Sequence, residues 1–260
     1  MPGLSAPAAG GLATLAFCSA LLVWRWLAGW AGCWLWLLPV VAWVALTRSF
    51  SRLALQRRAC LLGCLFEAHS PWPHRLRGRI WLPLRSAGAG LVVSLALTLE
   101  SLIWPLWWFG SLAAGLLVLV ALREWLRRRI AGLRPPWRDL AVTALAVRLW
   151  VAPMVVVLAL LQLFSPPPLI LHPGLVETLA QARASAGAAC PVLDVILSLW
   201  VEGSAVGWWT MAQAGEELHD LGLRVLLWGG FLLSGGLAFV AAGRLTLMLA
   251  DGLGGRRDEA

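Results

Sequence analysis

The stretch GLATLAFCSALLVWRWLAGWAGCWLWLLPVVAWVAL, residues 11–46, contains one charged side chain, Arg25. A second stretch, AGAGLVVSLALTLESLIWPLWWFGSLAAGLLVLVAL, residues 87–122, also contains one, Glu100. A single helix of either length would be about 54 Å long, whereas the hydrocarbon core of a bilayer is about 30 Å thick. Each stretch therefore predicts a hairpin of two short transmembrane helices rather than one long helix.

Residues that favour turns lie near the middle of each stretch. Gly29 and Gly32 are expected to form the turn of the first hairpin, and Pro105 to break the helix in the second. Tryptophan prefers the membrane–water interface, so tryptophans near both turns place them at such an interface, although the same indoles could instead pack between helices. The tryptophans concerned are Trp24, Trp26, Trp30, Trp34, Trp36, Trp104, Trp107 and Trp108.

Composition extends this interpretation to the whole chain of 260 residues. Apolar side chains make up 60% of it and charged ones 13%, about half the charged share of ordinary soluble domains, and the mean hydropathy is +0.78. These values argue against a soluble enzyme, exclude a disordered chain, and indicate an all-α, polytopic, Trp-rich membrane protein. All 21 basic residues are arginine, and lysine, asparagine and tyrosine are absent, which suggests a GC-rich, bacterial genome.

The distribution of arginine predicts how the chain is oriented in the membrane. An arginine-rich stretch follows each hairpin, and Arg256 and Arg257 lie in the C-terminal tail. Under the positive-inside rule, about six spans with both termini in the cytoplasm place all of these arginines on one side of a bacterial inner membrane. The expected parts of this single membrane domain, 1–260, are the hairpin 11–46, an arginine-rich loop 48–85, the hairpin 87–122, an arginine-rich loop 123–138, a fifth span 140–164, an acidic external segment 165–223 and a sixth span 225–250.

Residues 191–211 are apolar enough to form a seventh span. Asp194, Ser198 and Glu202 recur at four-residue spacing and would form one polar stripe on a helix. A crossing here would bury two carboxylates and would place the arginine-containing tail outside. We therefore expect an amphipathic helix that lies on the outer interface.

Arg148 is the charged residue expected deepest in the membrane, near the middle of the fifth span. Burying an arginine there costs about 3 kcal/mol on insertion scales, and Glu100 is the expected partner. The pair could belong to a proton or substrate path, or it could be a structural lock, or another subunit could neutralise Arg148. Arg25 and Arg244 are expected closer to the interfaces, where their guanidinium groups can reach water.

The sequence offers little evidence for catalysis or for a cofactor. Cys60, Cys64, His69 and His74 form a C-x3-C-x4-H-x4-H pattern that could bind zinc, but we expect the two cysteines to be apolar residues of an interfacial helix. No histidine lies within an expected span to ligate haem, and the motifs of nucleotide, serine and zinc hydrolases are absent. The odd number of cysteines and the absence of a CxxC pair predict no disulfide framework.

Six arginines have the setting of residues that contact anionic lipid headgroups at the cytoplasmic face, or an acidic cytoplasmic partner. No aromatic-interleaved signature favours nucleic acid. The C-terminal stretch DGLGGRRD, residues 251–258, resembles short stretches in inner-membrane proteins of bacterial conjugative elements, and the resemblance assigns a role to none of its residues. The six arginines are Arg52, Arg57, Arg58, Arg127, Arg128 and Arg129.

Two functions remain. The first is a non-catalytic subunit or assembly component of a larger inner-membrane complex, such as a secretion or conjugation machine, which would bind other membrane proteins. The alternative is a small transporter or permease subunit that uses Glu100 and Arg148. Neutralising Glu100 distinguishes them, because loss of uptake with intact expression indicates transport, whereas loss of the protein indicates a structural pair.

Overall fold

The computed structural model describes residues 5–65, 81–130, 135–164, 174–185, 187–217 and 221–254. In these ranges the chain is an all-α bundle, and seven of its helical segments are long and apolar enough to cross a membrane. The predicted class, a multi-pass helical membrane protein, is therefore confirmed. The elements are α1 (Ala6–Leu27), the short 3-10 helix η1 (Gly32–Trp36), α2 (Leu37–Leu65), α4 (Trp81–Ile103), α5 (Leu106–Arg129), α6 (Pro135–Phe164), α7 (Leu175–Ser185), α8 (Pro191–Glu217) and α9 (Leu221–Leu253).

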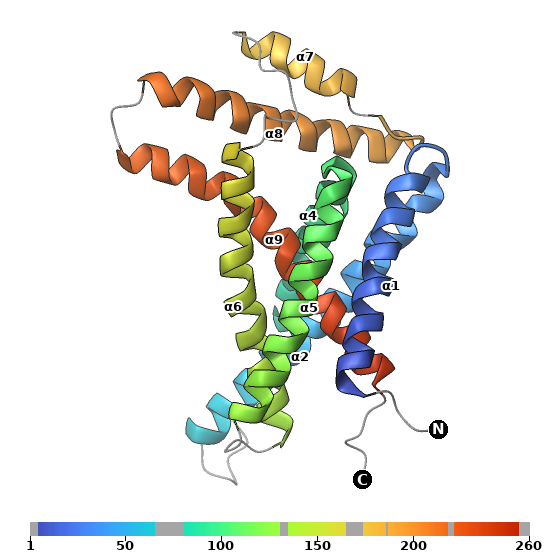
Figure 1. Ribbon diagram of the computed structural model, residues 1–260, viewed down its shortest axis with the longest axis vertical. Coiled ribbons are helices and arrows are strands. Elements are labelled where there is room, and N and C mark those ends of the chain that lie inside the picture. Colours follow the sequence, from blue (N-terminus) through green and yellow to red (C-terminus); the bar gives the residue numbers. More distant parts are fainter. Residues whose placement is uncertain are drawn as a thin grey trace.

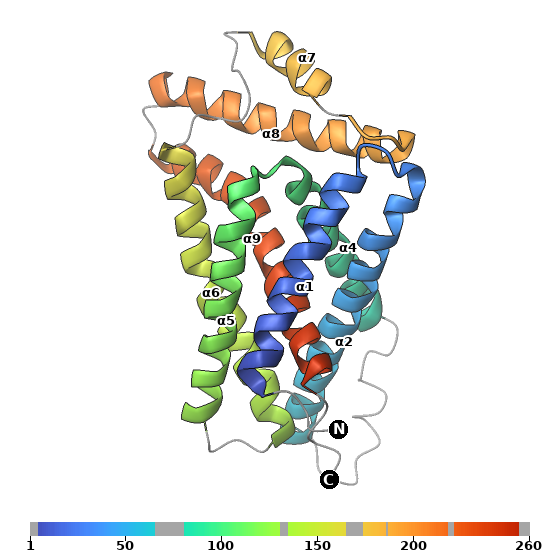
Figure 2. The ribbon, with the colours of Figure 1, turned by 45° about the vertical axis from the view of Figure 1, so that its right-hand side comes forward.

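Both predicted hairpins are present, and they turn where the sequence indicated. Between α1 and α2, Gly32 has a φ of 58°, a conformation that glycine adopts without the steric cost of a side chain. Between α4 and α5, Pro105 is the N-cap residue of α5, because proline cannot donate the hydrogen bond that would continue α4. Figures 1 and 2 show both turns at the same end of the bundle.

α8 lies across this end of the bundle, with α7 on its outer side (Figures 1 and 2). One face of α8, formed by Leu193, Leu197 and Val201, is buried in a cluster that includes Trp24 and Leu99. At 1.5 Å per residue, α8 is about 40 Å long, enough to cover the end of the bundle. Although its length and composition would allow a seventh span, it does not run alongside α4, α5 and α6, in agreement with the predicted amphipathic helix.

The arginine-rich stretches are more helical than predicted. Residues 48–85 were expected to form a loop, but α2 continues to Leu65 and α4 begins at Trp81. In the same way, α5 continues to Arg129 and α6 begins at Pro135, inside the expected loop 123–138. Arginine is a good helix former. No proline follows Pro39 in α2, and none lies in α5, so α2 and α5 continue beyond their apolar residues.

The core of the bundle is centred on Phe239 of α9, which is fully buried. Its ring centroid lies 6.1 Å from that of Trp104, 6.3 Å from that of Trp108 and 6.0 Å from that of Trp150, the range of favourable aromatic pairs. The turn tryptophans thus divide between the two roles considered from the sequence. Trp24, Trp104 and Trp108 are buried, whereas Trp26, Trp30, Trp34 and Trp107 are exposed.

Candidate functional site

α6 and α9 line a cavity of about 340 Å³. Its lining contains two charged side chains, and both are arginines. The rest of its wall is apolar, so nothing in the lining neutralises them. The lining residues are Ala144, Val147, Arg148, Val151 and Ala152 of α6 with Val240 and Arg244 of α9.

Arg148 occupies an unusual place for an arginine in a membrane helix. It lies about 20 Å along α6 from Pro135 and about 24 Å from Phe164, at 1.5 Å per residue, so it is far from both ends. Its side chain is nevertheless exposed on the outside of the chain. Within the described ranges it forms no ion pair with a carboxylate.

Arg244 is more enclosed and is only partly satisfied. Its Nη1 donates a hydrogen bond to the Ser49 hydroxyl at 3.2 Å, and its guanidinium lies 4.5 Å from the centroid of the Phe50 ring. Its Nε is buried and has no hydrogen-bond partner. Arg57 and Arg148 are close enough to repel its charge. The cavity therefore concentrates positive charge, and the group that would best satisfy it is an anion.

Glu100, the predicted partner of Arg148, lies at a different depth. It is about 5 Å along α4 from Ile103, near the end that α8 covers, and the Trp104 side chain hydrogen-bonds to it. Arg148 is about 24 Å along α6 from Phe164, so it lies farther from this end of the bundle than Glu100 does. No ion pair joins them among the residues that the structure describes. The sequence already indicated that Glu100 and Arg148 lie at different depths, because Glu100 comes shortly before the turn at Pro105 and Arg148 is near the middle of its span.

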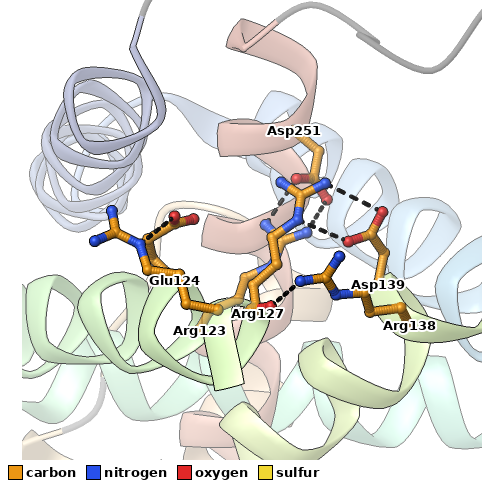
Figure 3. Close-up of polar contacts among 7 residues, drawn as sticks. Arg123, Glu124, Arg127, Arg138, Asp139 and Asp251 are labelled. Carbon is orange, nitrogen blue, oxygen red and sulfur yellow. Dashed lines mark hydrogen bonds and ion pairs between the residues drawn. The ribbon is translucent and has the colours of Figure 1, made fainter. Parts of the chain in front are cut away.

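A second charged site lies at the opposite end, where α5, α6 and α9 meet (Figure 3). Arg123 of α5 donates two hydrogen bonds to the Asp251 carboxylate of α9, at 2.7 and 3.0 Å. Arg127 of α5 pairs with Asp139 of α6 at 3.0 Å, and Arg138 of α6 donates to the backbone oxygen of Arg127. These contacts hold the ends of three helices together.

This network changes the interpretation of the arginines predicted to contact lipid or partners. Besides the bond from Arg127 to Asp139, Arg128 pairs with Glu124 at 3.1 Å, and the Arg129 guanidinium lies 5.7 Å from the centroid of the Trp125 ring. All three α5 candidates thus have intramolecular contacts that sequence analysis missed. On α2, Arg52 and Arg57 are exposed and Arg58 is half-buried, and lipid contact by these three stays a prediction.

The end covered by α8 is held by a disulfide bond. Cys33 of η1 and Cys190, which precedes α8, are bonded, with their Cα atoms 4.8 Å apart and 157 positions apart in sequence. The Ala189 amide also donates a hydrogen bond to the Ala28 carbonyl oxygen at 3.3 Å. The sequence implies no disulfide framework and did not predict this single bond, because the pairing depends on α8 lying over the first turn.

The candidate zinc pattern lies outside what the structure describes. His69 and His74 fall between the described ranges, and of Cys60 and Cys64 only the backbone is described. Among the described side chains, no group of three or more metal-ligating residues could hold a metal ion. Cys18, the described cysteine outside the disulfide, is buried.

No family model, curated protein or solved structure matches this chain. Three places in the described part of the chain have distinctive chemistry, which are the cavity lined by arginines, the ion-pair network and the disulfide-bonded end. Of these, the cavity is the place where charge is left unsatisfied, which makes it the strongest candidate for a binding site.

Proposed function

We propose that this protein is a non-catalytic, multi-pass subunit of a larger bacterial inner-membrane complex, such as a secretion or conjugation machine. The observation that carries the proposal is Arg148, which is exposed on the outside of α6 near its middle. An arginine that faces hydrocarbon costs about 3 kcal/mol or more, so such residues normally face a partner or a water-filled cavity. A neighbouring chain would cover Arg148 and remove this cost.

The alternative function, a transporter that uses Glu100 and Arg148 together, has less support. A shared path for a proton or a substrate needs both side chains within reach of the same ligand. No ion pair joins them among the described residues, and the Glu100 carboxyl has Trp104 as its neighbour instead. The subunit role requires no cooperation between them, and it is the role that we propose.

Two features support an orientation with both termini in the cytoplasm. α1 begins and α9 ends at the end of the bundle opposite α8 (Figure 1), where the arginines of α5 and the first turn of α6 also gather. Positive charge favours the cytoplasmic side. The bond between Cys33 and Cys190 lies at the other end, and disulfides persist in oxidising compartments such as the bacterial periplasm.

The subunit role is tested by purifying the full chain from its native membranes in a mild detergent. We expect other membrane proteins to elute with it in constant, stoichiometric amounts, as identified by mass spectrometry. The control is the same purification from cells that lack the tagged chain. Elution of the protein alone, or as a homo-oligomer, would contradict the proposal and would favour transport.

The orientation is tested with reporters fused after Ala260. A fluorescent protein that folds only in the cytoplasm is expected to be bright there, and alkaline phosphatase at the same position is expected to be inactive. A phosphatase fusion truncated after Gly187 is the matched control and is expected to be active, because this residue lies beside the disulfide-bonded end. An active phosphatase at Ala260 would exclude the six-span arrangement.

A further inference from the structure

We propose that the cavity between α6 and α9 is the docking site for a transmembrane helix of a different polypeptide, and that a carboxylate on this helix pairs with Arg148 and Arg244. The inference rests on the proposed function and specifies the chemistry of the partner. The charge of the cavity, its shape and depth, and the positions of the described carboxylates of this chain all favour such a partner.

The charge of the cavity calls for an anionic group. Arg148 and Arg244 are both in its lining and no carboxylate is. The Arg244 guanidinium donates one hydrogen bond, to the Ser49 hydroxyl, and neither arginine has a carboxylate partner among the described residues. A carboxylate can accept hydrogen bonds from two guanidinium groups at once, and such charge-assisted bonds are roughly twice as strong as neutral ones.

The shape of the cavity suits a helix. Ala144, Val147, Arg148, Val151 and Ala152 are spaced so that they share one face of α6. The alanines at either end of this face let another helix backbone approach closely, as small residues do at helix interfaces in membranes.

The depth of the cavity argues for a helix over a lipid headgroup. Arg148 lies about 15 Å from Arg138, where the apolar part of α6 begins, so it is near the middle of a hydrocarbon core of about 30 Å. Arg244 lies nearer to the end where the arginines gather, beside Ser49 and Phe50. Lipid phosphates lie outside this core and would reach Arg148 only if the bilayer became thinner. A transmembrane helix can carry a carboxylate at any depth.

The partner is a different polypeptide because the part of this chain that the structure describes has no carboxylate to offer at that depth. Glu100 lies one turn from the end covered by α8 and nearer to it than Arg148 does, so a second copy in the same orientation would present it at a different depth from Arg148. The remaining described carboxylates lie outside the middle of the spans, and four of them already pair with arginines. These four are Glu124, Asp139, Glu202 and Asp251.

The test uses a synthetic transmembrane peptide of leucine and alanine with one central glutamate, and a matched peptide with glutamine in its place. The full chain, labelled at its C-terminus with a donor fluorophore, is placed in phosphatidylcholine vesicles with an acceptor-labelled peptide, and energy transfer is titrated. We expect the glutamate peptide to bind at least about tenfold more tightly, the ratio that corresponds to about 1.4 kcal/mol. The Arg148→Gln/Arg244→Gln double variant is expected to bind both peptides equally.

The matched control is Arg85→Gln, which changes an exposed arginine of α4 outside the cavity and is expected to keep the preference for glutamate. If the double variant does not fold, Arg148→Gln alone serves, because its exposed side chain can be replaced without leaving a buried gap; a reduced preference is then expected. Equal binding of the two peptides by the unchanged protein would overturn the inference. So would loss of the preference when phosphatidylglycerol is added, because a lipid phosphate would then be the occupant.

The outcomes also separate this inference from the proposed function. Co-purifying membrane proteins without any preference for the glutamate peptide would leave the subunit role standing and refute the docking site. A preserved preference in a protein that purifies alone from native membranes would support the chemistry of the cavity and refute the subunit role.

Discussion

The two ends of the bundle are held together by different chemistry. At one end, ion pairs join α5, α6 and α9 through Asp139 and Asp251. At the other, the bond between Cys33 and Cys190 joins η1 to the start of α8, above an apolar cluster that contains Trp24 and Leu99. Exposed ion pairs contribute little to stability individually, whereas a cross-link between distant segments restricts the unfolded chain strongly. We therefore expect the two ends to differ in how much they stabilise the fold.

The same comparison bears on the compartments that the two ends face. Ion pairs form in any compartment, but they weaken as salt screens them. A disulfide is unaffected by salt and is lost under reducing conditions. Salt and reductant should therefore act on opposite ends of this protein, and each of the two predictions below uses one of them.

The largest effect is expected from removal of the disulfide. Cys33→Ser should destabilise the purified protein by about 3–5 kcal/mol, the range for loss of a native disulfide that closes a long loop. Without the bond, α8 is held over the first turn by apolar packing and the hydrogen bond from Ala189 to Ala28. The measurement is thermal unfolding in detergent, with limited proteolysis to show whether α7 and α8 become cleavable first.

The control for this variant is the reductant itself. Dithiothreitol should lower the thermal stability of the unchanged protein and leave that of Cys33→Ser unaltered. Cys18→Ala, at a buried cysteine outside the disulfide, should keep the response to dithiothreitol. A Cys33→Ser protein as stable as the unchanged one would show that apolar packing alone holds α8 in place.

Local features and long-range contacts differ in how far the sequence could predict them. The turn at Pro105 and the polar stripe from Asp194 to Glu202 depend on neighbouring residues, so they could be found from spacing. The pairing of Glu202 with Arg183 of α7 at 2.8 Å was not predicted, because it joins two different helices. The pairs of Arg123 with Asp251 and of Cys33 with Cys190 depend on which helices lie side by side, and spacing carries no information about that.

The candidate site follows the same division. The exceptional depth of Arg148 could be calculated from the expected span, since it depends on chain length alone. That Arg244 would share its cavity, and that Glu100 would not, depends on the packing of α9 against α6 and α4. The sequence therefore identified the unsatisfied charge, whereas no ion pair joins it to Glu100, the partner expected from the sequence, among the described residues.

A smaller effect is expected at the ion-pair end. Asp251 is 59% exposed, and Arg123, which donates both hydrogen bonds, is 16% exposed. A double-mutant cycle with Arg123→Gln and Asp251→Asn should give a coupling free energy of about 1 kcal/mol, at the upper limit for an exposed pair because the geometry is bidentate. Thermal unfolding at low and high salt measures it, and the coupling should fall as salt rises.

The matched control is the pair of Arg128 with Glu124, which lies within a single helix and joins no two elements. A cycle with Arg128→Gln and Glu124→Gln should give about 0.3–0.5 kcal/mol, the usual value for an exposed pair four residues apart. A coupling between Arg123 and Asp251 no larger than this would mean that the network does not hold α5 against α9. The arginines of α5 would then be available for anionic lipid headgroups, as the sequence predicted, and packing around Phe239 would have to hold the three helices together at this end as well.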